Sequence, residues 1–171
     1  MSFPADSMHK IMTRRFESDG LVIAGTSAGA MAMSTEMISG GSSSEALVKG
    51  AVEMRDGMNF IPKLIIDTHF IKRGRFGRMA EAVAKHPGLL GVGLAEDTGL
   101  IIRGSNHFTV IGSGMVIIFD PSDLQNNNEK ILPKGMPMTM SNLRVHILAN
   151  SDTFTIDKKE IHVLPIDAEF E

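Results

Sequence analysis

The chain has 171 residues, 43% of them hydrophobic, and a formal net charge of −3 at pH 7. These values are typical of a single α/β domain over 1–171, and the slightly acidic balance argues against a nucleic-acid partner. Without cysteine the chain has no disulfide or thiolate metal site, and without a signal core or an apolar run of roughly 20 residues we expect a cytoplasmic protein that does not enter a membrane.

The predicted elements begin with a helix over about 6–18 and an apolar run at 21–24 that is typical of a strand. The Gly-Thr-Ser-Ala-Gly that follows at 25–29 fits a tight turn into a helix. A serine on such a turn projects its hydroxyl away from the sheet, so Ser27 is the candidate nucleophile. An ordinary glycine-rich turn is the alternative, because Gly-x-Ser-x-Gly alone is a weak pattern.

A second apolar run, at 64–66, ends in Asp-Thr-His and supplies a candidate base. Before it, residues 46–58 are expected to cross back over the sheet. A nucleophilic serine needs a base, usually histidine, and His69 lies where the predicted strand gives way to a loop. A partly buried histidine without a catalytic role is the alternative.

Basic residues gather at the start of the next predicted helix, at Lys72, Arg73, Arg75 and Arg78. Cations at a helix N-terminus oppose its dipole by about 0.3–1 kcal/mol each, so helix stability does not account for them. Because arginine binds carboxylates through paired hydrogen bonds, the cluster indicates an acidic ligand. A solvated basic face paired with Glu81 or with other acids is the alternative.

A glycine-rich apolar strand over about 88–95 leads into two carboxylates, Glu96 and Asp97. Glu96 is the first acid after the strand and is the candidate to orient the imidazole of His69. Asp97 could serve instead, or both acids could merely shape a turn.

The rest of the chain is expected to be rich in β-structure. Apolar runs separated by turn residues predict short strands at about 99–103, 107–111, 115–119, 143–148, 153–156 and 161–164. A turn-rich excursion is predicted at 120–128. No spacing of His, Asp and Glu indicates a metal site, so neither a metal nor another cofactor is expected.

Four motifs in order carry a family resemblance. They are Gly-Thr-Ser-Ala-Gly-Ala at 25–30, Ile-Asp-Thr-His-Phe at 66–70, Gly-Val-Gly-Leu-Ala-Glu-Asp-Thr at 91–98 and Val-Ile-Gly-Ser-Gly-Met-Val at 110–116. Together they resemble the cyanophycinase family of serine peptidases over roughly residues 8–150. The resemblance implies a three-layer α/β fold of the class I glutamine amidotransferase-like type, in which a parallel sheet lies between helices.

The resemblance also implies roles for individual residues. Ser27, His69 and Glu96 would be the catalytic residues, and Asp67, Arg73, Arg75 and Arg78 would bind substrate. Thr68 is also expected to bind substrate, but it stands where many members carry glutamine, so a substrate amide contact is missing or replaced. The implied reaction is hydrolysis of cyanophycin, a poly-aspartate with arginine on its side chains, to β-aspartyl-arginine dipeptides. Hydrolysis of the aspartyl dipeptidase type is the alternative.

Family members extend much further upstream, so the resemblance implies that this chain is the C-terminal portion of the family's domain. The backbone N–H of Ala28 would then be one oxyanion donor, and an upstream strand would supply the second. Without that second donor we expect the chain to be weakly active or inactive. A nucleophile strand without its neighbours also exposes an edge, so we expect a homo-oligomer, a dimer. A non-enzymatic, truncated relative is the alternative, whereas an amidotransferase is disfavoured because the nucleophile position holds serine.

Overall fold

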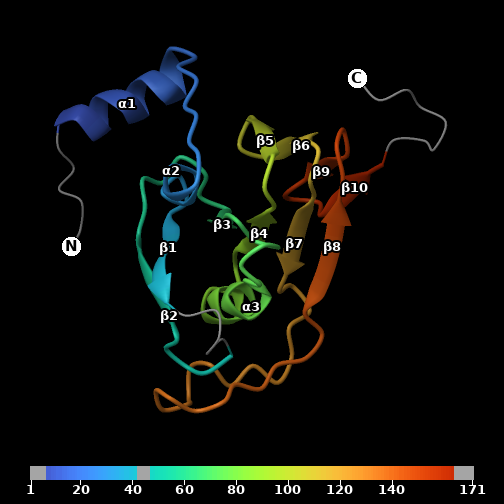
Figure 1. Cartoon of the computed structure of the whole chain (residues 1–171). Helices are drawn as coiled ribbons and strands as arrows, with labels where there is room; N and C mark the ends of the chain where they lie inside the picture. The colour runs from blue at the N-terminus through green and yellow to red at the C-terminus, as the bar shows by residue number, and fades with distance from the viewer. Residues whose placement is uncertain (1–6, 42–46, 164–171) are drawn as a thin grey trace.

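The computed structural model describes residues 7–41 and 47–163, which form three helices, a two-stranded sheet and two four-stranded sheets (Figure 1). The helices are Ser7–Ser18 (α1), Ala28–Met31 (α2) and Phe76–Lys85 (α3). The strands are Glu36–Gly41 (β1), Val52–Asp56 (β2), Leu64–Asp67 (β3), Leu90–Leu94 (β4), Thr98–Arg103 (β5), His107–Gly112 (β6), Val116–Asp120 (β7), Arg144–Leu148 (β8), Thr153–Thr155 (β9) and Glu160–His162 (β10). Asp6, Ala46 and Leu164, which bound three of the predicted elements, lie outside the described residues.

The central sheet has the strand order β3-β4-β7-β8 and is mixed. β3 and β4 are parallel, whereas β7 pairs antiparallel with both β4 and β8. The connections explain this difference. Parallel neighbours need a long crossover, which α3 provides between β3 and β4, but β4 is connected to β7 through the β5–β6 hairpin. The fold is therefore mixed α/β, and the predicted parallel pairing is confined to β3 and β4 among these four strands.

The strands predicted after residue 98 are confirmed, and they are divided between the two sheets. Four of them form the second sheet in the order β10-β9-β6-β5, whereas β7 and β8 belong to the central sheet. The prediction for 46–58 is wrong in part, because β2 folds back antiparallel on β1 instead of crossing the sheet. Apolar Val52 and Met54 alternate with charged neighbours there, which is the two-residue period of a strand.

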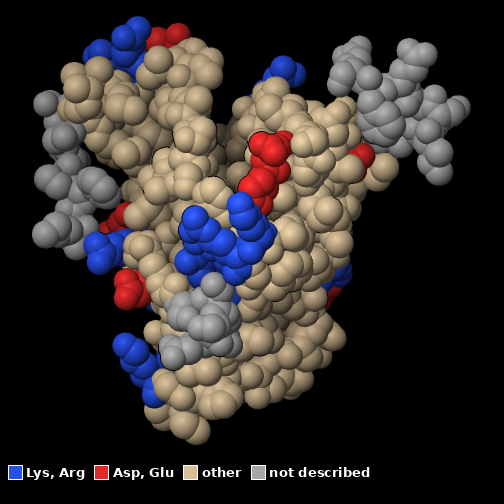
Figure 2. Space-filling view, viewed as in Figure 1, with Lys and Arg blue, Asp and Glu red and all other residues tan. Residues whose placement is uncertain are grey.

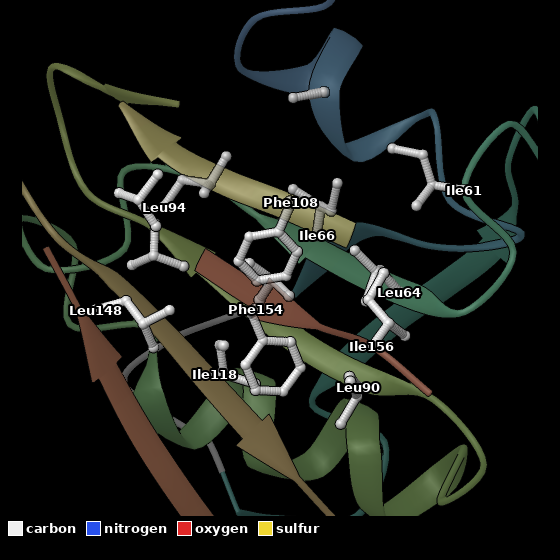
Figure 3. Packing of buried hydrophobic residues seen from close by; sticks show 14 of the residues in the cluster. Ile61, Leu64, Ile66, Leu90, Leu94, Phe108, Ile118, Leu148, Phe154 and Ile156 are labelled. Atoms are coloured by element: carbon white, nitrogen blue, oxygen red, sulfur yellow. The ribbon is translucent and has the colours of Figure 1, made fainter. Parts of the chain in front are cut away.

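Both faces of the central sheet are buried, each against a different layer. Ile65 of β3 faces the cluster that contains Met79 of α3, while the next residue, Ile66, faces the cluster that contains Phe108 and Phe154 of the second sheet. Figure 3 shows this second cluster, in which the rings of Phe108 and Phe154 stack with centroids 5.4 Å apart. One face of the sheet is thus covered by α3 and the other by a sheet.

The apolar run at 21–24 does not pair with any strand of the described residues, so its prediction as a strand is wrong for this structure. It connects α1 to α2 as an irregular segment, and Val22 is 85% exposed (Figure 1). A strand needs hydrogen-bonded neighbours, which an apolar pattern cannot supply by itself. Part of the free edge of β3 is occupied by Ser34, whose Oγ accepts a hydrogen bond from the Ile66 amide at 3.2 Å.

Gly93 generates a prediction about the packing of β4. A Cβ at this position would lie 2.4 Å from the ring of Phe70, which is fully buried. We expect Gly93→Ala to lower the free energy of unfolding by about 1–3 kcal/mol, because a rigid ring in a filled core has little room to shift. Gly88→Ala is the matched control, since no heavy atom lies within 4 Å of its added Cβ. Equal urea-unfolding midpoints for the two variants would contradict this packing.

Candidate active site

Ser27 lies on a strained turn at the start of α2. Its φ of 50° and ψ of −122° are uncommon for a residue with a side chain, and such strain clusters at functional sites. Gly25 permits the turn, because a Cβ there would lie 2.6 Å from the carbonyl oxygen of Gly29. Gly29 itself has open space around its added Cβ. The first glycine of the motif is therefore required by the turn, and the Ser27 side chain lies exposed at its tip.

A chain of hydrogen bonds joins the three residues that the sequence singles out as nucleophile, base and acid. The Oγ of Ser27 lies 3.1 Å from Nε2 of His69, and Nδ1 of His69 lies 3.2 Å from Oε1 of Glu96. These contacts fit a ring that donates its Nδ1 proton to the carboxylate and leaves Nε2 free to accept the serine proton. Asp97 instead contributes its backbone carbonyl to the turn, accepting from the Ser113 amide.

The parallel pair of strands brings His69 and Glu96 together. Parallel strands end at the same edge of a sheet, so the residues after β3 and after β4 are neighbours. The Phe70 amide donates to the Leu94 carbonyl at 3.0 Å, which ties the two loops to each other. A backbone carbonyl carries no sequence signal, so the motifs do not predict this contact.

The charge on Glu96 is favoured by its surroundings. Partial desolvation raises the pKa of this carboxyl, but hydrogen bonds to its own backbone and to His69, and the positive charge of Lys72, outweigh it and place the pKa below 4.5. Glu96 is therefore ionised at neutral pH, as an acceptor for the imidazole Nδ1 proton requires.

Three of the predicted substrate-binding residues contact each other inside the protein. Asp67 is fully buried, and Arg78 binds it through Nε and Nη2 at 2.8 and 2.6 Å. Nη1 of Arg75 also binds Asp67, at 2.8 Å. Two of the three arginines predicted to bind substrate thus bind an acid of the protein itself, Asp67, and substrate binding by them stays a prediction. Glu81, the alternative partner, accepts from the amides of Gly50 and Val52.

The other predicted residues differ in their exposure. Thr68 is buried, and its hydroxyl contacts Sδ of Met31 at 3.6 Å. Arg73 is exposed, and its guanidinium has no hydrogen-bond partner within 7–41 and 47–163. Figure 2 shows Lys and Arg side chains gathered beside Asp and Glu side chains on one face of the molecule. The Ala28 amide donates to no acceptor in the described part of the chain.

The described residues contain no group of three or more His, Cys, Asp or Glu placed to hold a metal ion. None of their helices is long and apolar enough to span a membrane.

Comparison with known proteins decides the family. The sequence model of peptidase family S51 matches residues 4–110, more than half of the chain. The chain belongs to peptidase family S51. It is 40% identical over 152 residues to a cyanophycinase of Trichormus variabilis, covering 89% of this chain and 51% of that protein. It is 37% identical over 141 residues to a cyanophycinase of Geminocystis herdmanii, covering 82% of this chain and 52% of that one. This S51 chain thus spans about half the length of the curated relatives it matches.

The lowered pKa of Glu96 predicts how the S51 chain responds to acid. A carboxyl whose pKa is lower in the folded state stabilises that state above its unfolded pKa of about 4.5, and this contribution is lost as pH falls through the folded pKa. We expect Glu96→Gln to be less stable than the wild type at neutral pH, and we expect the difference to shrink as the pH falls below about 4.5 and through the lower folded pKa of Glu96.

Urea unfolding at a series of pH values measures this difference, with Glu17→Gln on α1 as the control. A difference between wild type and Glu96→Gln that stays constant down to low pH would contradict the electrostatic account.

Proposed function

We propose that this chain carries the catalytic residues of a serine-type peptidase that hydrolyses cyanophycin to β-aspartyl-arginine dipeptides, acting as an exopeptidase. The observation that carries the proposal is the hydrogen-bonded series Ser27–His69–Glu96, built on a strained turn and on the ends of two parallel strands. The two relatives compared above are both named cyanophycinases, which supports the choice of substrate.

The mechanism follows from the positions of these groups. Ser27 Oγ attacks the scissile carbonyl carbon while its proton passes to Nε2 of His69. Glu96 accepts the Nδ1 proton in a hydrogen bond and stabilises the imidazolium that forms. The N–H of Ala28 donates to the oxyanion, and His69 then gives its proton to the leaving amine. Water attacks the resulting acyl-enzyme by the same route in reverse, which releases the acid and restores Ser27.

For the complete protein we propose the class I glutamine amidotransferase-like fold, as a single domain with helices on both faces of a parallel sheet. The β3–α3–β4 unit supports this, because it is a parallel pair with a helical crossover. In that fold the run at 21–24 becomes a strand between neighbours, which would cover Val22. We further propose a cytoplasmic homodimer that takes an aspartate- and arginine-rich polymer as its substrate.

The nucleophile can be tested with a neutral fluorophosphonate probe, which reacts with activated serines. We expect labelling of the wild type and loss of labelling in Ser27→Ala and His69→Ala, since a serine without its base is unreactive. Ser39→Ala, an exposed serine on β1, should label as the wild type does. Mass spectrometry of the labelled peptide gives the modified residue. Unchanged labelling in Ser27→Ala would refute the serine mechanism, and a wild type that resists the probe would favour a non-enzymatic relative.

Arg73 is proposed to bind a carboxylate of the substrate, because its exposed guanidinium is free of partners in the described residues. A hydrogen bond to a charged group contributes about 1.5–3 kcal/mol, so Arg73→Ala should raise KM for an aspartate-rich substrate by tenfold or more. Hydrolysis of a neutral ester should not change. Arg103→Ala, which removes an exposed arginine at the end of β5, is the control. Equal losses on acidic and neutral substrates would mean that Arg73 does not select the substrate.

A further inference from the structure

We propose that Asp67, Arg75 and Arg78 are positioning residues: they form a buried ion cluster that fixes the backbone before His69 and so aims its imidazole at Ser27. The inference rests on the proposed function, because it treats His69 as the base. It gives Asp67, Arg75 and Arg78 a role other than the substrate binding that the family resemblance implies.

The Asp67 carboxylate accepts four hydrogen bonds from the protein itself. Its Oδ1 accepts hydrogen bonds from the Thr68 amide at 2.9 Å, from Arg75 at 2.8 Å and from Arg78 at 2.6 Å. Its Oδ2 accepts from Nε of Arg78 at 2.8 Å. A carboxylate offers about four acceptor sites, and Asp67 has no exposed surface. A substrate therefore cannot reach it without breaking the cluster.

The same cluster holds the peptide groups on both sides of Thr68. The Thr68 N–H donates to Asp67, and the Thr68 carbonyl accepts from Nη1 of Arg75 at 2.6 Å. Nη1 of Arg75 thus binds a side chain and a backbone carbonyl at once. Because both peptide groups are held, the backbone that leads into His69 has one fixed orientation.

His69 needs such support because its backbone is strained. Its φ of 52° lies in the left-handed region, which residues with side chains rarely adopt. After His69, the Phe70 amide binds the Leu94 carbonyl and the Arg73 amide binds the His69 carbonyl, both at 3.0 Å. The residue is therefore held by the ion cluster on one side and by backbone hydrogen bonds on the other. This conformation places Nε2 3.1 Å from the serine oxygen.

Arg75 is the member of the cluster that can be changed with least damage to the fold. If Arg75 is removed, Arg78 still binds Asp67 through two hydrogen bonds, so the buried carboxylate keeps a partner. Removal of Asp67 would instead leave two cations in a largely buried site without their acid. Arg75→Met keeps much of the side-chain volume and frees the Thr68 carbonyl, and Arg75→Lys restores the charge.

The test compares the rate at which the neutral fluorophosphonate labels Ser27 in these variants of the whole chain. We expect Arg75→Met to label at least tenfold more slowly than the wild type and Arg75→Lys to recover part of the rate. Arg55→Met on β2 should label normally. Because the probe has no carboxylate, loss of a substrate-binding charge alone would not slow it. Wild-type labelling in Arg75→Met would overturn the inference.

A second measurement does not depend on activity and separates this inference from the proposed function. The ring signals of His69 in NMR spectra should move in Arg75→Met, while amide signals of β4 and β7 stay in place. If the wild type does not label at all, the proposed function fails, and the His69 signals alone decide the positioning role. Unmoved His69 signals would overturn it. Should Arg75→Met not fold, Arg75→Gln provides the same two measurements.

Discussion

The parallel pairing of β3 with β4 is the constraint on which the site depends. It sets Asp67 beside Gly93, so the loops that follow both strands leave the sheet at the same edge. The hydrogen bond from Phe70 to Leu94 then locks these loops together, and His69 and Glu96 meet although 27 positions separate them. Gly93 makes this possible, because the ring of Phe70 occupies the space that a Cβ would need.

The buried charged side chains near the site bind the protein's own backbone at Thr68. An unpaired buried carboxylate is costly, and Asp67 avoids this cost by binding Arg75, Arg78 and the Thr68 amide. The cations at the start of α3 oppose its dipole, and the compensating charge comes from β3. Arg75 and Arg78 therefore bind an acid of the protein, whereas the exposed Arg73 makes no such contact with the described residues.

The turn at Ser27 forms although the apolar run before it is not paired in a sheet. The elbow at Ser27 forms because Gly25 allows the backbone of Gly29 to come close, and this local requirement can be read from the motif. The run at 21–24 has the composition of a strand but no neighbouring strand in the described residues, and it stays irregular. A turn can form from its own residues alone, whereas a strand needs the hydrogen bonds of a neighbouring strand.

The sequence by itself determined the local features: the elbow serine, the strand ends that carry His69 and Glu96, the helix after the basic loop and the short C-terminal strands. These depend on turn residues, apolar periodicity and motif order, which are properties of neighbouring residues. Only the tertiary structure decided the direction of β7, the choice of Glu96 over Asp97 and the pairing of Arg75 and Arg78 with Asp67. These depend on which distant groups meet and which are shielded from water, and the order of residues along the chain does not contain that information.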